Sequence, residues 1–272
     1  MLHDTKLIDD EIDDGVNYYE QSSRKEPARK YMRAPIIAGE VLVLVGLLVI
    51  MFVFYQLVFT NVVAARDQAN EVAGIRDAWS QESSDDEGSS IAAGTMGIIT
   101  SSKLGGEYPL FKGTEQSTLA KGPGVYEGSA RFGSKGNVGI AAHRDGWNAP
   151  FSNVDTLNVC DNLRIEDRSS IYTYTVISHA DDPGTRTEQN KNCLGDDLAQ
   201  TLDSDQYKDL SGQSIVDPSY GRVVWQVPGK SDAPDEASLP ILTLTSCHPH
   251  WSNEQRIIVH AVLTEIKAKY TK

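Results

Sequence analysis

A long apolar run near the N-terminus restricts how this chain can fold more than any other feature. Val41 to Phe59 (VLVLVGLLVIMFVFYQLVF) lies inside an almost uncharged segment, and a helix of this length crosses a hydrocarbon core of about 30 Å. A cleaved signal peptide is the alternative, but its apolar core is usually about 7 to 15 residues long. Because this run is longer and begins well inside the chain, the sequence predicts an uncleaved transmembrane anchor over residues 35–62.

The charges on either side of the apolar run predict its orientation. The preceding segment RKEPARKYMR is rich in arginine and lysine, whereas only Arg66 and Arg76 follow closely, with several acidic residues between and beyond them. By the positive-inside rule, we expect residues 1–34 to form a cytoplasmic tail and the C-terminal bulk to lie outside the cell. The chain is therefore expected to be a single-pass protein of the cell membrane.

The part of the chain after the anchor divides into a linker and a globular domain. Residues 63–90 are expected to form an extracellular linker, in which a polar helix could continue as far as Gln81 before the spacer ESSDDEGSS. Over residues 91–272, short β-rich runs alternate with Gly, Asn, Asp and Pro clusters, a pattern typical of an all-β barrel or sandwich. The clearest strand-like runs, together with one helical insertion at 196–210, are residues 137–142, 163–166, 172–179, 222–227, 241–245 and 256–266.

The net charge of −13 argues against nucleic acid as a partner, because the chain has no basic stripe to replace counterions on phosphate groups. Much of the excess acid lies in DDEIDDGVNYYE near the start and in the spacer after the anchor. Charge runs of this kind are typical of solvated linkers. The functional residues are therefore sought in the globular domain.

Three residues of that domain combine the groups of a covalent acyl-transfer site. Cys247 ends the run ILTLTSC, Arg256 opens the next strand-like run, and His143 follows the run NVGIAA. A cysteine attacks as the thiolate, which a nearby imidazole or cation favours. A fixed guanidinium can also stabilise the negative charge that develops on a carbonyl oxygen under attack. The sequence thus indicates Cys247 as nucleophile, His143 as acid and base, and Arg256 as the stabiliser of that charge.

A zinc site is the competing interpretation of the CHPH segment, which places His248 and His250 beside Cys247. A closed structural zinc site requires four ligands, and His143 would have to leave the catalytic set to supply the fourth. The sequence therefore predicts no metal and no other cofactor.

The other two cysteines of this three-cysteine chain, Cys160 and Cys193, lie on connecting segments of the domain. In the oxidising exterior they could form a disulfide that leaves Cys247 as the free thiol. The alternative is two unpaired, partly buried thiols that behave as small apolar residues.

Two longer blocks carry a family resemblance. GNVGIAAHRDGWNAPFSNVDTL and LPILTLTSCHPHWSNEQRIIVHAVL resemble the histidine and cysteine blocks of sortases, the surface-anchored cysteine transpeptidases of Gram-positive bacteria, and most of all those of the actinobacterial class E. The resemblance implies an eight-stranded β-barrel with short helices and a catalytic set of His143, Cys247 and Arg256. It also implies cleavage between Thr and Gly of an LPXTG-like sorting signal through a Cys thioester. An exported protein bearing that signal would then be transferred to an amine of a peptidoglycan precursor similar to lipid II.

Two positions depart from the family pattern. Ser246 stands before the cysteine where the family usually has threonine, and Trp147 lies where class E members often have a tyrosine associated with LAXTG signals. Ser246 and Trp147 are therefore candidate substrate-binding residues, together with Trp251 in the loop after Cys247. The choice between LPXTG and LAXTG stays open.

Two alternative functions share these residues. A pilin-polymerising sortase would use a lysine amine, but residues 91–124 contain no Asp-Pro-aromatic tripeptide and the chain ends in the polar segment TEIKAKYTK. A non-catalytic module that binds sorting signals or wall peptides is the second alternative, and the intact Cys, His and Arg argue against it.

Overall fold

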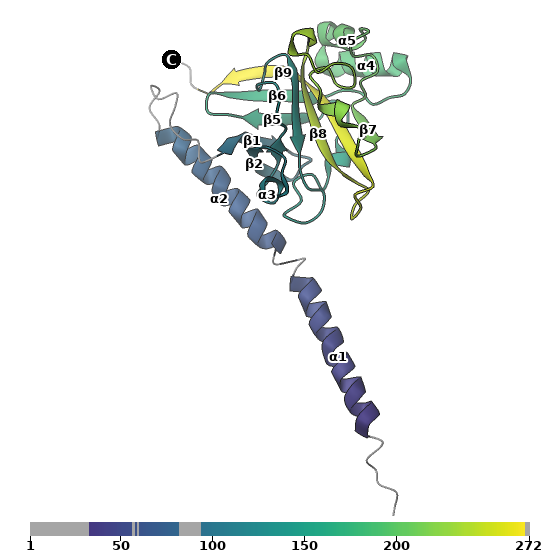
Figure 1. Ribbon diagram of the computed structural model, residues 1–272. Coiled ribbons are helices and arrows are strands. Elements are labelled where there is room, and N and C mark those ends of the chain that lie inside the picture. The colour runs from purple at the N-terminus through teal and green to yellow at the C-terminus, as the bar shows by residue number, and fades with distance from the viewer. Residues whose placement is uncertain (1–32, 56–57, 59, 82–93, 270–272) are drawn as a thin grey trace, which may run out of the picture. The chain divides into compact units, whose positions relative to one another are not determined.

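The computed structural model describes residues 33–55, 58, 60–81 and 94–269 (Figure 1). The chain separates into two compact units, residues 1–50 and 51–272. The predicted cytoplasmic tail lies almost entirely outside the described residues, as does the spacer ESSDDEGSS.

Helix α1 (Arg33–Phe54) contains the predicted apolar run. Its stretch Ile36–Phe54 is exposed throughout and is long and apolar enough to cross a membrane. This helix confirms the predicted N-terminal apolar segment as far as Phe54; part of the predicted continuation to Phe59 is outside the described residues.

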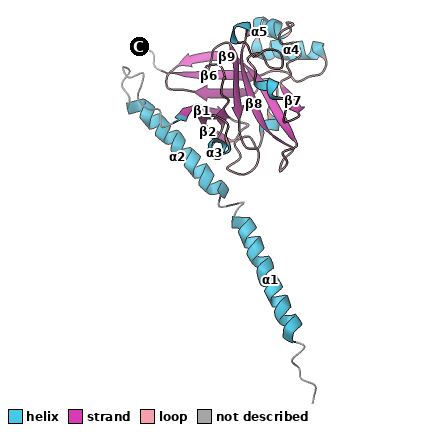
Figure 2. Cartoon of the chain, in the orientation of Figure 1, coloured by secondary structure: helices cyan, strands magenta, loops and turns pink. Residues whose placement is uncertain are grey.

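The second unit is built around one β-sheet with short helices at its margins (Figure 2). Its strands are β1 (Thr95–Ser101), β2 (Gly106–Lys112), β3 (Gly124–Val125), β4 (Gly136–Ala141), β5 (Asn162–Glu166), β6 (Ser170–Val176), β7 (Gln213–Val216), β8 (Pro240–His248) and β9 (Gln255–Ala268). Its helices are α2 (Thr60–Gln81), α3 (Gln116–Leu119), α4 (Pro183–Leu194) and α5 (Asp196–Leu202), with the 3-10 turns η4 (Val154–Thr156), η5 (Gly221–Val224) and η6 (Pro234–Glu236).

Eight of these strands close into a barrel. The hydrogen-bonded order runs β6-β5-β1-β2-β3-β4-β8-β9, and a further pairing of β6 with β9 joins its two ends. The long strand β9 makes this closure: its beginning pairs with β7, and its later part, from Ala261 to Ala268, pairs with β6. β7 is thus a ninth strand beside the ring. The structure confirms the predicted all-β, eight-stranded barrel.

The barrel interior is filled by large apolar side chains from every side of the ring. Fully buried members include Ile99, Leu110, Ile140, Phe151, Leu163, Tyr174, Leu242 and Val259. Each such side chain contributes roughly 1.5 to 3 kcal/mol relative to its exposed state. This packed core fixes the positions of the strands and therefore of the residues at their ends.

One predicted strand is wrong. Residues 222–227 form η5 and irregular backbone instead. The buried side chain of Asn137 explains the difference, because its Nδ2 donates to the backbone carbonyls of Val223 (3.1 Å) and Trp225 (3.0 Å). Carbonyls held in this way are not available to a strand ladder. The predicted helix at 196–210 is also shorter than expected, because α5 ends at Leu202 and turns follow.

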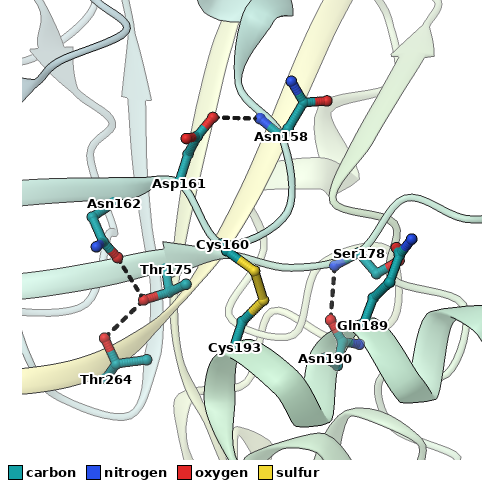
Figure 3. Close-up of a disulfide and its surroundings, with 10 residues drawn as sticks. All are labelled: Asn158, Cys160, Asp161, Asn162, Thr175, Ser178, Gln189, Asn190, Cys193 and Thr264. Atoms are coloured by element: carbon teal, nitrogen blue, oxygen red, sulfur yellow. Dashed lines mark hydrogen bonds between the residues drawn. A yellow bond between two sulfur atoms is a disulfide. The ribbon is translucent and has the colours of Figure 1, made fainter.

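Helix α4 is held to the barrel by a disulfide (Figure 3). Cys193 on α4 is bonded to Cys160, which lies just before β5, with their Cα atoms 5.3 Å apart. Asn190, one turn earlier on the same helix, accepts a 2.8 Å hydrogen bond from the backbone N–H of Ser178. The disulfide and the hydrogen bond of the Asn190 side chain together fix α4, a helix that has little apolar surface of its own.

Helix α2 packs against the outside of the barrel at β1 and β2. Its side chains Val72, Ile75 and Trp79 form a buried cluster with Ile98 of β1. The segment 63–90, expected to be a linker, therefore begins with a helix that is part of the second unit.

Candidate active site

The site forms where two parallel neighbours of the barrel end. β4 and β8 run parallel and in register, from Gly136 opposite Pro240 to Ala141 opposite Thr245. Because the carboxyl ends of parallel strands meet at one edge, the residues that follow β4 lie beside the last residues of β8. His143 comes two residues after β4, and Cys247 is the penultimate residue of β8.

Arg256 reaches the same place from the next strand. β8 and β9 are antiparallel, and Cys247 lies directly opposite Arg256 in their register. Directly opposed residues of an antiparallel pair share one face of the sheet, with Cβ atoms about 4.5 to 5.5 Å apart. The loop that connects β8 to β9 therefore brings the side chain of Arg256 back beside the thiol of Cys247.

A cleft of about 270 Å³ brings the three side chains together. His143, Cys247 and Arg256 all line it. Further lining residues that the sequence did not indicate are Thr114, Gln116, Tyr126 and Asn253. Tyr126 and Arg256 also line a neighbouring cleft of about 170 Å³, whose other wall is the segment from Val216 to Val224. The signal that could have found Asn253 is its place in the loop between Cys247 and Arg256.

The polar groups of the cleft differ in their hydrogen bonding. The Cys247 thiol donates to Asn253 Oδ1 at 3.4 Å. His143 Nε2 is buried and, among the described residues, makes no hydrogen bond. Burial lowers the pKa of His143, so its neutral form is favoured and can accept a proton. Arg256 Nη1 donates to the carbonyls of Asn253 (3.3 Å) and Gln255 (2.9 Å), which orients the guanidinium.

Arg144 and Asp145, which directly follow His143, connect its loop with the segment that follows Cys247. The buried Arg144 forms an ion pair with Asp155 at 2.7 Å, and its Nη1 lies 3.1 Å from His248 Nδ1. Asp145 Oδ1 lies 2.6 Å from His250 Nδ1. These contacts give both histidines of the CHPH segment a partner at the loop that carries His143.

Asp145 and Arg144 also bind backbone groups of Cys247 and of the loop that follows it. Asp145 Oδ2 accepts a 2.8 Å bond from the N–H of Trp251. The side chain of Arg144 also reaches the carbonyl of Cys247 at 3.5 Å. The two loops that border the cleft are therefore joined through both side chains and backbone.

The candidate substrate-binding residues occupy different surroundings. Ser246 lines the cleft and donates through its hydroxyl to the carbonyl of Ala142 at 2.8 Å. Trp147 and Trp251 are 45% and 74% exposed, and neither belongs to the described residues that line the two clefts. Both have positive φ angles, 53° and 61°, so each indole is presented from a tight turn. The structure thus places Ser246 in the lining of the cleft and leaves the two tryptophans exposed and outside that lining.

A comparison with known families matches residues 99–264 to the sortase domain. This match covers more than half of the chain and includes His143, Cys247 and Arg256. The chain belongs to the sortase family, whose members are cysteine transpeptidases.

Two sortases of Streptomyces coelicolor are among the relatives. SrtE2 is 32% identical over 166 residues, which are 56% of this chain and 64% of that protein. SrtE1 is 25% identical over 257 residues, 90% of this chain and 62% of that protein. The chain thus spans less than two thirds of the length of either relative. These matches confirm the resemblance to class E.

Solved structures agree on the fold. The SrtF sortase from Corynebacterium diphtheriae has a TM-score of 0.62 and 29% sequence identity, covering 65% of this chain and 88% of that one. The SrtA sortase from Actinomyces oris, at 22% identity and a TM-score of 0.50, covers 68% and 90% and supports the fold alone.

Proposed function

We propose that this protein is a membrane-anchored transpeptidase that cleaves an LPXTG- or LAXTG-like sorting signal between Thr and Gly. The observation that carries the proposal is that His143 lines one cleft at the edge of the barrel together with Cys247 and Arg256, although it lies far from both in sequence. A thiol, a neutral imidazole and a fixed cation around one cavity are the groups that acyl transfer from a peptide requires.

The first half of the reaction forms a thioester. His143 takes the thiol proton as Cys247 Sγ attacks the Thr carbonyl, and negative charge develops on the carbonyl oxygen. Arg256 stabilises this charge more in the transition state than in the ground state. His143 then gives its proton to the Gly amine, the C–N bond breaks, and the C-terminal fragment leaves.

The second half transfers the acyl group to an amine. The incoming amine attacks the thioester carbonyl and gives a proton to His143, and the thiolate leaves and recovers that proton. We propose an amine of a lipid II-like cell-wall precursor as the natural acceptor, and exported proteins with a C-terminal sorting signal as donors. Water in place of the amine would give hydrolysis, so the choice between these outcomes rests with the walls of the cleft.

The chain organisation fits this role. We propose that α1 anchors the protein in the cell membrane as a single span, with residues 1–34 in the cytoplasm and the barrel outside. Residues 63–90 then separate the catalytic domain, 91–272, from the bilayer. Support comes from the exposed apolar stretch Ile36–Phe54 and from the basic flank before it.

The proposal is tested by incubating the full chain in detergent with LPXTG and LAXTG peptides and an amine, followed by mass spectrometry. We expect a thioester at Cys247 and a ligated product, and neither with Cys247→Ala. The Arg256→Lys variant keeps the charge but loses the planar fork, and should lower kcat about 100-fold.

The double variant Cys160→Ala/Cys193→Ala is the matched control, because it removes two other cysteines and keeps the thiol of the cleft. It should still form the thioester below its own unfolding temperature. Turnover by Cys247→Ala would overturn the proposed nucleophile. A wild-type chain that binds the peptides without cleaving them would favour a binding module.

A further inference from the structure

Helix α2 contributes a polar side chain to the loop that follows His143. The carboxamide of Gln68 is 3% exposed. Its Nε2 donates to the backbone carbonyl of Trp147 at 3.3 Å, and its Oε1 accepts from Asn148 Nδ2 at 3.0 Å. A glutamine is seldom buried to this degree, and here both ends of its amide are used by one loop.

That loop has an unusual backbone. Gly146, Trp147, Asn148 and Ala149 follow one another with positive φ angles of 68°, 53°, 60° and 33°. Side-chain-bearing residues adopt this region at a cost, and successive examples persist only where neighbouring structure holds them. The two hydrogen bonds of Gln68 are made with Trp147 and Asn148, the two central residues of this series.

The loop is directly connected to the catalytic histidine. The carbonyl of His143 accepts a 3.1 Å bond from the N–H of Phe151, and the N–H of Ala149 donates to Gly146 at 2.7 Å. The turn therefore closes on the backbone of His143. Trp147 and Asn148 therefore lie within the turn that this bond closes.

The docking of α2 fixes Gln68 in place. Among the side chains of the helix that the structure describes, the buried ones are Ala64, Gln68, Val72, Ile75 and Trp79, and their spacing puts them on one face. Beside this face, Arg76 pairs with Glu107 at 2.7 Å and with Glu166 at 3.0 Å. The apolar cluster and the ion pairs thus hold the helix, and the helix holds the loop.

We propose that Gln68 is a positioning residue for the catalytic reaction: it restrains residues 146–149 and through them the position of His143. The juxtamembrane helix then belongs to the catalytic unit and does more than space the barrel from the bilayer. The kinetic part of this inference rests on the proposed transpeptidase activity, whereas the structural part does not.

The test compares Gln68→Leu with Asn70→Leu in the full chain. Both replace a carboxamide by an apolar group on α2, but Asn70 is exposed. Hydrogen–deuterium exchange should rise in residues 144–152 of Gln68→Leu and stay at the wild-type level in Asn70→Leu. With a cleavable sorting peptide, kcat should fall about tenfold in Gln68→Leu alone, since small displacements of a catalytic group are costly.

A double-mutant cycle separates positioning from helix docking. Asn148→Ala removes one of the two bonds, so the loss of kcat in the combined variant Gln68→Leu/Asn148→Ala should be smaller than the sum of the two single losses. Unchanged exchange in the loop, or additive losses of kcat that follow the loss of thermal stability, would overturn the proposal. If the wild-type chain cleaves no peptide, the proposed reaction fails and the exchange measurement alone decides the role of Gln68.

Discussion

At the residue scale, the hydroxyl of Ser246 connects the strand that carries the thiol with the strand that leads to the histidine. Its bond to the carbonyl of Ala142 is 2.8 Å long and buried. Ser246→Ala leaves this bond unmade and should lower the free energy of unfolding by about 1 kcal/mol. It should also lower kcat/KM several-fold, because one of the bonds that join the ends of β4 and β8 is lost.

Ser246→Thr is the matched control, since it keeps the hydroxyl that related sortases usually have here. Urea unfolding and peptide cleavage measure the two effects. Equal behaviour of the alanine and threonine variants would contradict the role of this hydroxyl.

A second residue gives the fold a pH dependence. His260 on β9 is buried, and its Nδ1 lies 2.9 Å from the carbonyl of Ser211. Burial lowers its pKa to about 4, from an ordinary value near 6.5. Below pH 6.5 the unfolded chain binds a proton that folded His260 does not, so stability falls as the pH drops from about 6.5 to about 4. The loss from this group is about 3 kcal/mol at most.

His260→Gln removes the titrating ring and keeps an N–H donor for Ser211. Thermal unfolding between pH 7 and pH 4 should therefore show a shallower decline for the variant than for the wild type. Parallel curves for the two proteins would contradict the assignment.

At the scale of elements, α2 depends on one aromatic anchor. Trp79 is 5% exposed, packs with Ile98, and lies under Lys269, whose Nζ is 4.1 Å from its ring centroid. Trp79→Ala removes the largest side chain of the cluster and should destabilise the docked helix by about 3 kcal/mol. Limited proteolysis of the full chain should then show new cleavage within residues 60–81, while the barrel stays protected.

The control for this prediction is Ser80→Ala, which changes the neighbouring position on the exposed side of α2. It should leave the protease pattern unchanged. A Trp79→Ala chain with a wild-type pattern would mean that the other contacts of α2, which include the ion pairs of Arg76, hold the helix without the indole.

The same elements show why sequence prediction succeeds in part. β8 and β9 contain long apolar runs, and the turn of the β5–β6 hairpin carries Asp167, whose Oδ1 accepts from the N–H groups of Ser169 and Ser170. Those signals are local, and the apolar runs among them predict strands at 163–166, 172–179, 241–245 and 256–266. β3 has two residues, α4 is polar and is held by a disulfide, and the packing of α2 on β1 depends on a distant strand. No local pattern carries that information.

At the scale of the whole molecule, the site depends on barrel topology. The apolar runs of the sequence place a thiol, an imidazole and a guanidinium near predicted strand ends. The family resemblance assigns all three to one catalytic set. Their meeting requires β4 to lie parallel to β8, although the strands are about a hundred residues apart in sequence. The bonds of Arg144, Asp145 and Gln68 are equally long-range, so no sequence pattern predicts how the loop that follows His143 is held.

The proposed orientation across the membrane depends on features from two distant parts of the chain. The basic flank before α1 predicts a cytoplasmic N-terminus, and the Cys160–Cys193 disulfide is of the kind that persists outside the reducing cytoplasm. Both support the proposal that the partly exposed thiol of Cys247 lies outside. A small membrane-impermeant methanethiosulfonate reagent should therefore modify Cys247 in intact cells. In a Cys247→Ala background, Ser23→Cys should react only after permeabilisation. The reverse pattern would place the barrel in the cytoplasm and contradict the proposed orientation.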